Sequence, residues 1–280
     1  MNWILGSAGF IGEAISDCLE NQGIPVERIN RQKFDFKNKN EVQELAKLIK
    51  SDDTIIFLVG VVPCRDELQL IQNVSMLENL TESLSHDYKG KFVYVSSDSV
   101  YSDSNAIVLE NYTLAPSSIH GQMHLFRERI VLERFKSNFL ILRPTNVYGK
   151  NDPHNSYGPN RFIRQIMECQ PISLIGKGEE IRDHIHVSEV SEVMSRLVQH
   201  NAKGIFNIST GQLFSFREIA ERVINHFECK NLRNKLMYQN RISRKISNPV
   251  RNISNSKLLM YLPKLTFTEM TQHWTNEYGK

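Results

Sequence analysis

The stretch Trp3-Ile4-Leu5-Gly6-Ser7-Ala8-Gly9-Phe10-Ile11-Gly12 decides the fold. A short apolar run ends at Gly6, and the three glycines stand three residues apart. Apolar residues then recur at helical spacing, at Ile11, Ala14, Ile15, Cys18 and Leu19. A strand, a tight glycine turn and a helix in this order let backbone N–H groups approach a pyrophosphate at the positive end of the helix. We therefore expect a dinucleotide-binding loop formed by Gly6, Gly9, Phe10, Ile11 and Gly12.

The first half of the chain alternates apolar strands with helices. Further strands are expected at Pro25–Ile29, Ile55–Val59, Phe92–Val95 and Phe139–Leu142, and helices at Val42–Lys50, Leu68–Ser85 and Ser118–Phe135. This alternation is typical of an α/β fold with a parallel, doubly wound sheet of the Rossmann type.

The character of the chain changes after Gly149. Residues 150–161 are rich in Asn, Pro, Gly and Tyr and are expected to form a surface loop, whereas Gly204–Ser209 could return one strand to the sheet. We expect the dinucleotide-binding domain over residues 1–165 and about 182–210. A smaller, interleaved C-terminal substrate lobe is expected over about 166–181 and 211–280.

The composition excludes several classes of protein. Hydrophobic residues make up 40% and charged residues 23% of the chain, and the net charge is +3, so no nucleic-acid partner that relies on a basic stripe is expected. No apolar run reaches the roughly 18 residues of a membrane span, and the N-terminus lacks the pattern of a signal peptide. The four cysteines form no CxxC pair, which favours reduced thiols in the cytoplasm over disulfides or structural zinc.

The end of the second strand bears on the choice of cofactor. A carboxylate there usually holds the ribose of NAD, whereas an Arg accommodates the 2′-phosphate of NADP. The sequence reads Arg28-Ile29-Asn30-Arg31, and Glu27 comes too early. We therefore favour NADP(H) over NAD(H), with Arg31 as the phosphate partner; alternatively, Arg28 and Arg31 are solvated surface charges. Other expected cofactor contacts are Asn30, Asp35, Leu58, Val59 and Gly60.

Three further motifs follow the glycine loop in order. They are Ser96-Ser97-Asp98-Ser99-Val100-Tyr101, Leu142-Arg143-Pro144-Thr145-Asn146-Val147-Tyr148-Gly149 and Arg182-Asp183-His184-Ile185-His186-Val187. With the loop, this set resembles the extended short-chain dehydrogenase/reductase family, which contains nucleotide-sugar epimerases, dehydratases and reductases. The resemblance covers nearly the whole chain.

The resemblance implies roles for particular residues. Ser97 would hydrogen-bond the reacting sugar oxygen, and Asp98 stands where some dehydratases and 4-keto reductases of the family also carry Asp. Ser99, Asn146, Arg182 and Arg251 would bind the nucleotide-sugar substrate. A guanidinium can hold phosphate oxygens bidentately, although Arg182 could instead form a surface ion pair with Asp183.

The chain departs from the family at the Tyr-x-x-x-Lys pair on the helix after the fourth strand. His120 and His124 stand at these two positions, and a shifted register offers Met123 and Arg127 instead. Residues four apart share one helix face. An imidazole titrates near pH 6.5 and can supply a proton, so His120 is a candidate proton donor. His124 could then hydrogen-bond the cofactor ribose, with Arg127 supplying the missing charge.

Two other interpretations of this helix stay open. In one, the helix has lost its chemistry; in the other, the histidines are incidental and Ser97, Asp98 or water supplies the proton. A metal site is not expected, because His-x-x-x-His alone supplies two ligands and no third is obvious.

The missing Tyr-x-x-x-Lys pair favours reduction, since oxidation of a sugar alcohol needs a good base. The expected preference for NADP(H) favours reduction as well. The sequence predicts an NADP(H)-dependent reductase of a nucleotide-linked 4-keto-6-deoxysugar, such as dTDP-4-keto-6-deoxyglucose, in surface polysaccharide synthesis. The alternatives are an NAD-dependent epimerase or dehydratase and a catalytically impaired nucleotide-binding regulatory protein. A homodimer is expected from the family resemblance. Its face could include Ile119, Leu125, Ile130 and Leu132, which core packing explains equally well.

Overall fold

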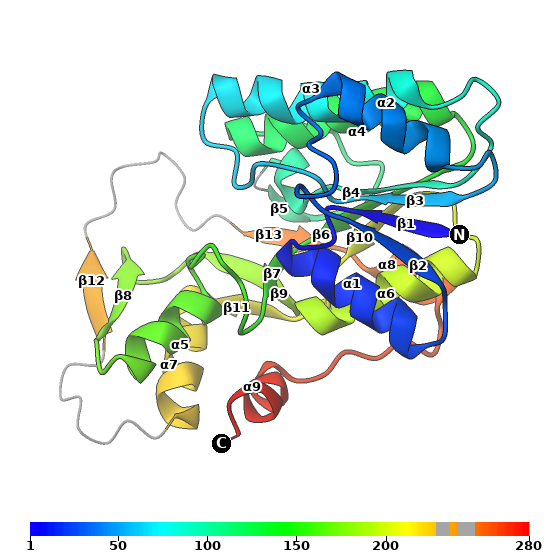
Figure 1. The fold of residues 1–280 in the computed structure, drawn as a ribbon. Helices are drawn as coiled ribbons and strands as arrows, with labels where there is room; N and C mark the ends of the chain where they lie inside the picture. Colours follow the sequence, from blue (N-terminus) through cyan, green and yellow to red (C-terminus); the bar gives the residue numbers. More distant parts are fainter. Residues whose placement is uncertain (103, 228–235, 240–249, 280) are drawn as a thin grey trace. The chain divides into compact units, whose positions relative to one another are not determined.

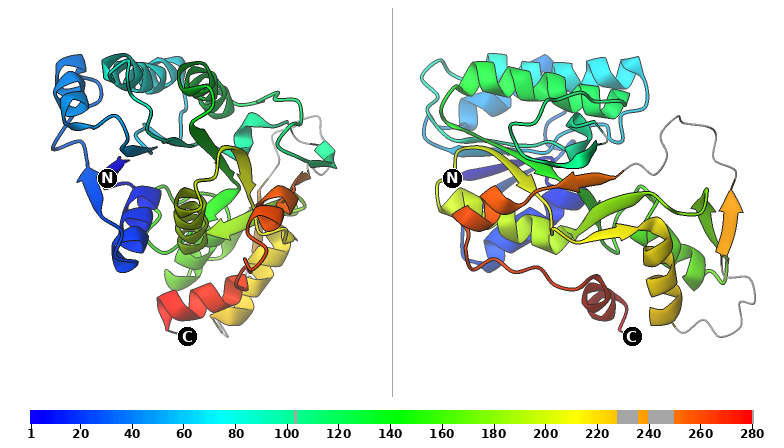
Figure 2. Two further views of the ribbon diagram at one scale, coloured as in Figure 1. Left: turned by 90° about the vertical axis from the view of Figure 1, so that its right-hand side faces the viewer. Right: turned by 180° about the vertical axis from the view of Figure 1, so that it is seen from behind.

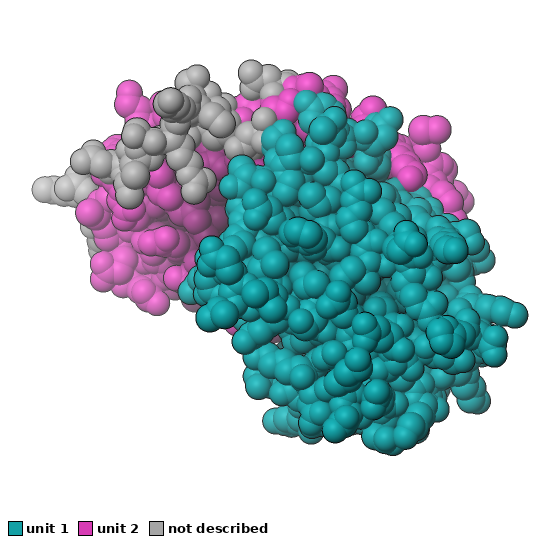
Figure 3. Space-filling model, turned by 90° about the horizontal axis from the view of Figure 1, so that it is seen from above, with its two compact units in different colours: residues 1–102, 110–144, 187–208 teal, residues 103–109, 145–186, 209–280 magenta. Residues whose placement is uncertain are grey.

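The computed structural model describes the whole chain except residues 103, 228–235, 240–249 and 280. The chain forms two compact units, which are coloured separately in Figure 3. Unit 1 contains Met1–Ser102, Glu110–Pro144 and Val187–Ile208. Unit 2 contains Asp103–Leu109, Thr145–His186 and Ser209–Lys280. Both units are therefore built from separated stretches of the sequence.

Unit 1 is built on a six-stranded parallel sheet in the order β10-β6-β4-β3-β1-β2. Its strands are β1 (Asn2–Leu5), β2 (Val26–Ile29), β3 (Thr54–Phe57), β4 (Phe92–Val95), β6 (Phe139–Pro144) and β10 (Gly204–Ile208). The inner strands are mostly apolar because helices cover both faces of the sheet. The predicted α/β fold with a parallel Rossmann-type sheet is confirmed.

The helices of unit 1 lie in two layers. Figures 1 and 2 show α2 (Lys39–Leu48), α3 (Glu67–Ser83) and α4 (Ile119–Phe135) on one face of the sheet. They show α1 (Phe10–Asn21) and α6 (Val187–Gln199) on the other face. The short 3-10 helix η1 (Asp98–Val100) follows β4. On the α2–α4 side, aromatic rings fill the core, and Phe92 stacks on Phe135 at 4.2 Å between ring centroids.

Capping residues set where the helices begin. The side chains of Asn38, Asp66 and Ser118 accept hydrogen bonds from backbone N–H groups in the first turns of α2, α3 and α4. Such caps satisfy amides that have no partner within the helix. This is why α2 begins at Lys39, before the expected start at Val42. The third strand ends at Phe57, so Leu58 and Val59 lie in the turn that follows it rather than in the strand.

Unit 2 contains three small sheets. The sheet β11-β9-β7 is formed by β11 (Leu213–Ser215), β9 (Ile181–His186) and β7 (Asn146–Tyr148). Two strand pairs join β12 (Leu236–Gln239) to β8 (Ile172–Ile175) and β13 (Arg251–Ile253) to β5 (Ser104–Val108). The helices are α5 (Pro159–Met167), α7 (Phe216–His226), α8 (Ser256–Tyr261) and α9 (Met270–Tyr278).

The division of the chain differs from the expected one. Residues 145–165 and 182–186, which the sequence assigns to the dinucleotide-binding domain, belong to unit 2. The physical reason is strand pairing, because β7 pairs with β9 and not with a strand of the six-stranded sheet. The expected surface loop over 150–161 is also shorter, since α5 begins at Pro159. None of the helices in the described part of the chain is long and apolar enough to cross a membrane.

Candidate functional site

The glycine loop joins β1 to α1 through a turn that only glycine fits. Gly6 has a φ of 94°, and a Cβ there would lie 2.9 Å from the carbonyl carbon of Leu58. A Cβ on Gly12 would lie 2.1 Å from the carbonyl oxygen of Gly6. The loop therefore closes tightly, and Gly12 lets α1 pack directly on it. Gly9 caps α1 without a side-chain acceptor, so the first amides of the helix keep their donor capacity for an anion.

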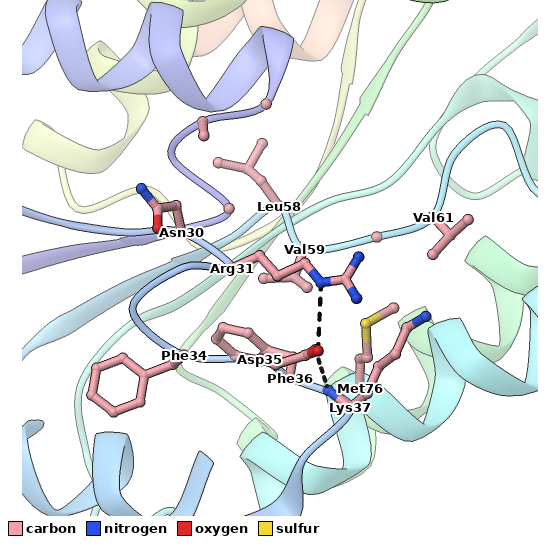
Figure 4. Close-up of a pocket in the computed structure, with 14 residues that line it drawn as sticks. Asn30, Arg31, Phe34, Asp35, Phe36, Lys37, Leu58, Val59, Val61 and Met76 are labelled. Carbon is pink, nitrogen blue, oxygen red and sulfur yellow. Dashed lines mark hydrogen bonds and ion pairs between the residues drawn. The ribbon is translucent and has the colours of Figure 1, made fainter. Parts of the chain in front are cut away.

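A pocket opens beside this loop at the carboxyl ends of β1, β2 and β3 (Figure 4). Eight of the residues expected at the cofactor line it: Gly6, Gly9, Asn30, Arg31, Asp35, Leu58, Val59 and Gly60. Phe10, Ile11 and Gly12 are not in its lining; they form the first turn of α1 next to the loop. Sequence reasoning missed Ala8, Phe34, Phe36, Lys37, Val61 and Met76. Ala8 lies within the glycine loop, Val61 follows Gly60, and Phe34, Phe36 and Lys37 lie next to Asp35, so their places in the sequence could have indicated them; Met76 of α3 had no such signal.

The tip of β2 carries the charges that bear on cofactor choice. Leu5 of β1 pairs with Ile29, so Asn30 is the first residue beyond the strand. The Arg31 side chain is 76% exposed, and its Nε lies 3.4 Å from a carboxylate oxygen of Asp35. Figure 4 shows these two side chains facing each other at the pocket. A free guanidinium edge at this place suits a phosphate ester.

The two charged residues of β2, Glu27 and Arg28, form ion pairs with residues that do not line the pocket. Arg28 forms ion pairs of 2.6 Å with both Asp17 and Glu20, and Glu27 pairs with Lys33 at 3.1 Å. Arg28 is thus the surface charge that one interpretation of the sequence expects, whereas Arg31 lines the pocket. No carboxylate extends from the strand tip itself, because Glu27 lies within β2.

The second cluster forms where η1 meets the N-terminal turn of α4. A Cβ on Gly121 would lie 2.1 Å from the carbonyl oxygen of Ser99, so glycine allows the helix to approach this turn. Ser97 caps η1 by accepting a hydrogen bond from the backbone N–H of Ser99 at 3.1 Å. The Ser97 hydroxyl lies 3.4 Å from a carboxylate oxygen of the buried Asp98. The structure therefore brings Ser97 and Asp98 to the start of the helix that carries the two histidines.

His120 and His124 lie on one face of α4, with ring centroids 4.7 Å apart. The Nδ1 atom of His120 accepts a hydrogen bond from the backbone N–H of Cys64 at 3.2 Å. The Nδ1 atom of His124 lies 2.7 Å from the hydroxyl of Tyr94 in the interior. Burial lowers the pKa of His120, with Arg127 acting in the same direction and Asp98 opposing it. Burial lowers the pKa of His124 well below its usual range.

Met123 and Arg127 lie in the interior. Met123 is fully buried, and Arg127 is nearly so. The Arg127 guanidinium donates to the carbonyl of Val59 at 2.8 Å and to that of Asn73 at 2.7 Å, and it lies over the Phe57 ring. Arg127 therefore holds the backbone that forms the pocket wall at Val59. The shifted register with Met123 and Arg127 offers no exposed reactive group.

A buried polar network fixes the end of β4, and sequence reasoning missed it. Glu128 and Arg143, each 1% exposed, form a bidentate pair with distances of 2.9 and 2.6 Å. The Ser96 hydroxyl donates to Glu128 at 2.6 Å. Arg143 also donates to the hydroxyl of Tyr101 at 2.6 Å. The network ties α4, β4 and β6 to the residues that flank η1. In the sequence, the signal for this network is Arg143, a charged residue within an otherwise apolar strand.

The expected substrate residues of unit 2 lie on neighbouring strands. Asn146 begins β7 and donates to the carbonyl of Asp183 at 3.2 Å. Arg182 pairs with Glu180 at 2.6 Å and is nearly buried. The suggested surface pair with Asp183 is thus wrong, because the Asp183 carboxylate accepts hydrogen bonds from Thr145 and Thr210. A bridge between Ile181 and Val250 places Arg182 and Arg251 at neighbouring positions of two strands.

Comparison with known proteins agrees with this geometry. A family model described as "NAD dependent epimerase/dehydratase family" matches residues 3–209. The UDP-glucose 4-epimerase of Thermus thermophilus in complex with NAD is similar in structure, with a TM-score of 0.81, 19% identity and coverage of 99% of this chain and 98% of that one.

Two further solved structures are similar to this chain. The structure of RMD from Pseudomonas aeruginosa with NADPH has a TM-score of 0.80 and 19% identity, covering 97% of this chain and 95% of that one. A dTDP-4-dehydrorhamnose reductase from Clostridium acetobutylicum has a TM-score of 0.79 and 15% identity, covering 99% and 98%. At these identities the similarity shows a shared fold.

Proposed function

Because this chain belongs to the NAD-dependent epimerase/dehydratase family, we propose that it is an NADP(H)-dependent reductase of a nucleotide-linked 4-keto-6-deoxysugar. A substrate such as dTDP-4-keto-6-deoxyglucose would yield a 6-deoxyhexose for surface polysaccharide, made in the cytoplasm. The observation that carries the proposal is the tip of β2, where Asn30 and Arg31 are the first residues beyond the strand and line the pocket, and where the one carboxylate of the lining, Asp35, pairs with Arg31. Such a tip accommodates the 2′-phosphate of NADP.

The cluster at α4 supports reduction over oxidation. Oxidation of a sugar alcohol needs a good base, and the tyrosine that the family uses depends on a nearby cation to act as one. Arg127, the cation of this helix turn, is instead engaged with the carbonyls of Val59 and Asn73. Reduction needs only a hydride from the cofactor and a proton for the oxygen of the carbonyl. Ser97 would hold that oxygen, and Asn146, Arg182 and Arg251 would bind the nucleotide diphosphate.

Two similar proteins lend support to this choice. One is described as a dTDP-4-dehydrorhamnose reductase and another is complexed with NADPH. The NAD complex of the Thermus epimerase supports the alternative of an NAD-dependent epimerase. Among these functions, reduction is the one that the α4 cluster and Arg31 favour together.

A homodimer remains part of the proposal, with a different face from the one expected. Ile130 and Leu132 pack against the core of unit 1 and are only partly exposed. Larger apolar side chains are exposed on the packed pair of helices α3 and α4, namely Leu68, Ile71 and Phe126. A second copy of the chain that packed on these two helices would cover the exposed apolar side chains.

The direct test is to incubate the protein with dTDP-4-keto-6-deoxyglucose and NADPH, and separately NADH, and to follow the loss of cofactor absorbance. We expect turnover with NADPH and a reduced sugar as product. The control is dTDP-glucose, which has no keto group to reduce. Absence of turnover with both cofactors would contradict the reductase. Interconversion of two nucleotide sugars without net cofactor consumption would identify an epimerase, and nucleotide binding without turnover would identify a regulatory protein.

A further inference from the structure

The first turn of α4 fixes which ring nitrogen of His120 carries the proton. The Nδ1 atom accepts a hydrogen bond from the backbone N–H of Cys64, with 3.2 Å between the nitrogens. A ring nitrogen that accepts a hydrogen bond is unprotonated, so the neutral ring carries its proton on Nε2. Protonation of Nδ1 would bring its N–H against the backbone N–H of Cys64, and the two donors would repel each other. The amide of Cys64 therefore selects one tautomer and disfavours the imidazolium.

The surroundings of the ring act in the same direction. His120 is the second residue of α4, where the partial positive charge of the helix N-terminus opposes a cation. Arg127 and His124 face it from the same helix, the Cys64 thiol belongs to the segment before α3, and Asp98 faces it from η1. Burial and Arg127 lower the pKa of His120, and only the Asp98 carboxylate raises it. The ring is thus neutral near physiological pH.

The Nε2 atom remains available to a ligand. Within the part of the chain that the structure describes, no group hydrogen-bonds this atom, and it is not among the side-chain nitrogens sealed from solvent without a partner. His120 also lies next to Gly121, whose contact with Ser99 brings η1 and Ser97 to this turn. A neutral N–H on this turn is a donor that suits the oxygen of a carbonyl group.

We propose that His120 is a fixed, neutral hydrogen-bond donor whose Nε2–H binds the carbonyl oxygen of the sugar and keeps its proton through the reaction. This inference rests on the proposed reductase, and it gives His120 a role different from that of the titrating proton donor expected from the sequence. The carbonyl carbon gains the hydride, and the oxygen gains a proton from water, which leaves as hydroxide. His120 stabilises the charge that develops on the oxygen before that proton arrives.

The first test observes the ring itself by ¹⁵N-resolved NMR of the labelled protein, with His120→Gln to assign the signals. At pH 6.5, where an ordinary histidine is half protonated, we expect the signals of a neutral ring with the proton on Nε2. Addition of the 4-keto-sugar nucleotide should shift the Nε2 signal. A cationic ring, a proton on Nδ1, or an unchanged Nε2 signal with saturating ligand would overturn the inference. These outcomes do not depend on turnover, so failure of the reductase proposal is seen separately.

The second test is the pH dependence of the reductase rate. We expect His120→Ala to lower kcat about 100-fold, as loss of one preorganised donor does, and His120→Gln to restore part of this loss through its amide N–H. The shape of the rate profile between pH 6 and 8 should be the same for the parent and for His120→Gln. A limb that falls with rising pH in the parent and is lost in the Gln variant would show an imidazolium acid and overturn the inference. The exposed His86 provides the control variant His86→Gln.

Discussion

The glycine loop before α1 and the first turn of α4 lie at the same carboxyl edge of one parallel sheet, yet they differ in what they retain of the family pattern. The loop keeps its glycines because backbone atoms fill the space of any Cβ at Gly6 and Gly12. The helix keeps Gly121 for the same steric reason, but His120 and His124 stand in place of the expected Tyr and Lys. Backbone packing fixes the first region, whereas side-chain chemistry can change in the second without altering the fold.

The largest expected effect concerns the network beneath α4. Glu128→Ala leaves the Arg143 guanidinium buried without its carboxylate, and breaking a buried pair in this way costs about 3–5 kcal/mol. We expect the free energy of unfolding, measured by denaturant titration, to fall by that amount. The control is Glu44→Ala, which breaks an exposed pair with Lys47 and should change little. Equal effects of the two variants would show that the network does not support this helix.

A second variant attacks the glycine loop. Gly12→Ala places a methyl group 2.1 Å from the carbonyl oxygen of Gly6, and backbone cannot yield as a flexible side chain would. Overpacking of this kind costs about 1–3 kcal/mol and should displace the loop, so dinucleotide binding by calorimetry should be lost. Glu13→Ala, an exposed neighbour on α1, should retain binding. Normal binding by Gly12→Ala would contradict a backbone-determined loop.

A smaller effect separates the two dinucleotides at the same pocket. Arg31→Ser should weaken NADPH binding about tenfold and leave NADH binding nearly unchanged, because the contact of an exposed arginine with phosphate lies at the low end of the range of about 1.5–3 kcal/mol for charge-assisted contacts. The matched control is Arg28→Ser, because Arg28 pairs with Asp17 and Glu20 away from the pocket lining. A parallel loss of affinity for both cofactors would remove Arg31 from the 2′-phosphate site.

The smallest expected effect is a pH dependence of the free energy of unfolding that arises from His124 of α4. Burial holds the pKa of His124 well below the ordinary value of 6.5. Below pH 6.5, His124 is protonated in the unfolded chain but stays neutral in the folded chain. The free energy of unfolding therefore falls as the pH falls below this value and is fully retained above it. The slope is at most about 1.4 kcal/mol per pH unit for one group.

The test compares unfolding of the parent and of His124→Gln between pH 7.5 and 5. The variant should lose a smaller part of its stability on acidification, whatever its stability at pH 7.5. Identical slopes for the two proteins would mean that His124 titrates normally in the folded state.

Much of unit 1 could be predicted because its signals are local. The apolar strands, the glycine spacing and the caps at Asn38, Asp66 and Ser118 act within a few residues of one another. The eight pocket residues that were expected follow from strand order, since parallel strands end at one edge, whereas Met76 comes from α3 and was missed.

The remaining features depend on contacts between distant residues. Cys64 and His120 are separated by 56 positions, so no sequence pattern shows that one selects the tautomer of the other. The pairing of Arg182 with Glu180, two residues away, was missed. The order of residues in the sequence does not show that Thr145 and Thr210 already engage the Asp183 carboxylate. The grouping of residues 145–165 with unit 2 likewise depends on which strand β7 pairs with.

The most direct test is transfer of deuterium to dTDP-4-keto-6-deoxyglucose from NADPH that carries deuterium at both positions of the nicotinamide C4. It asks whether an intact cofactor loop serves reduction at an altered α4. Mass spectrometry of the product would be compared with the cofactor oxidised. We expect one deuterium in each reduced sugar and one NADPH consumed for each. A product without deuterium, or isomerised sugar with the cofactor unconsumed, would contradict this expectation.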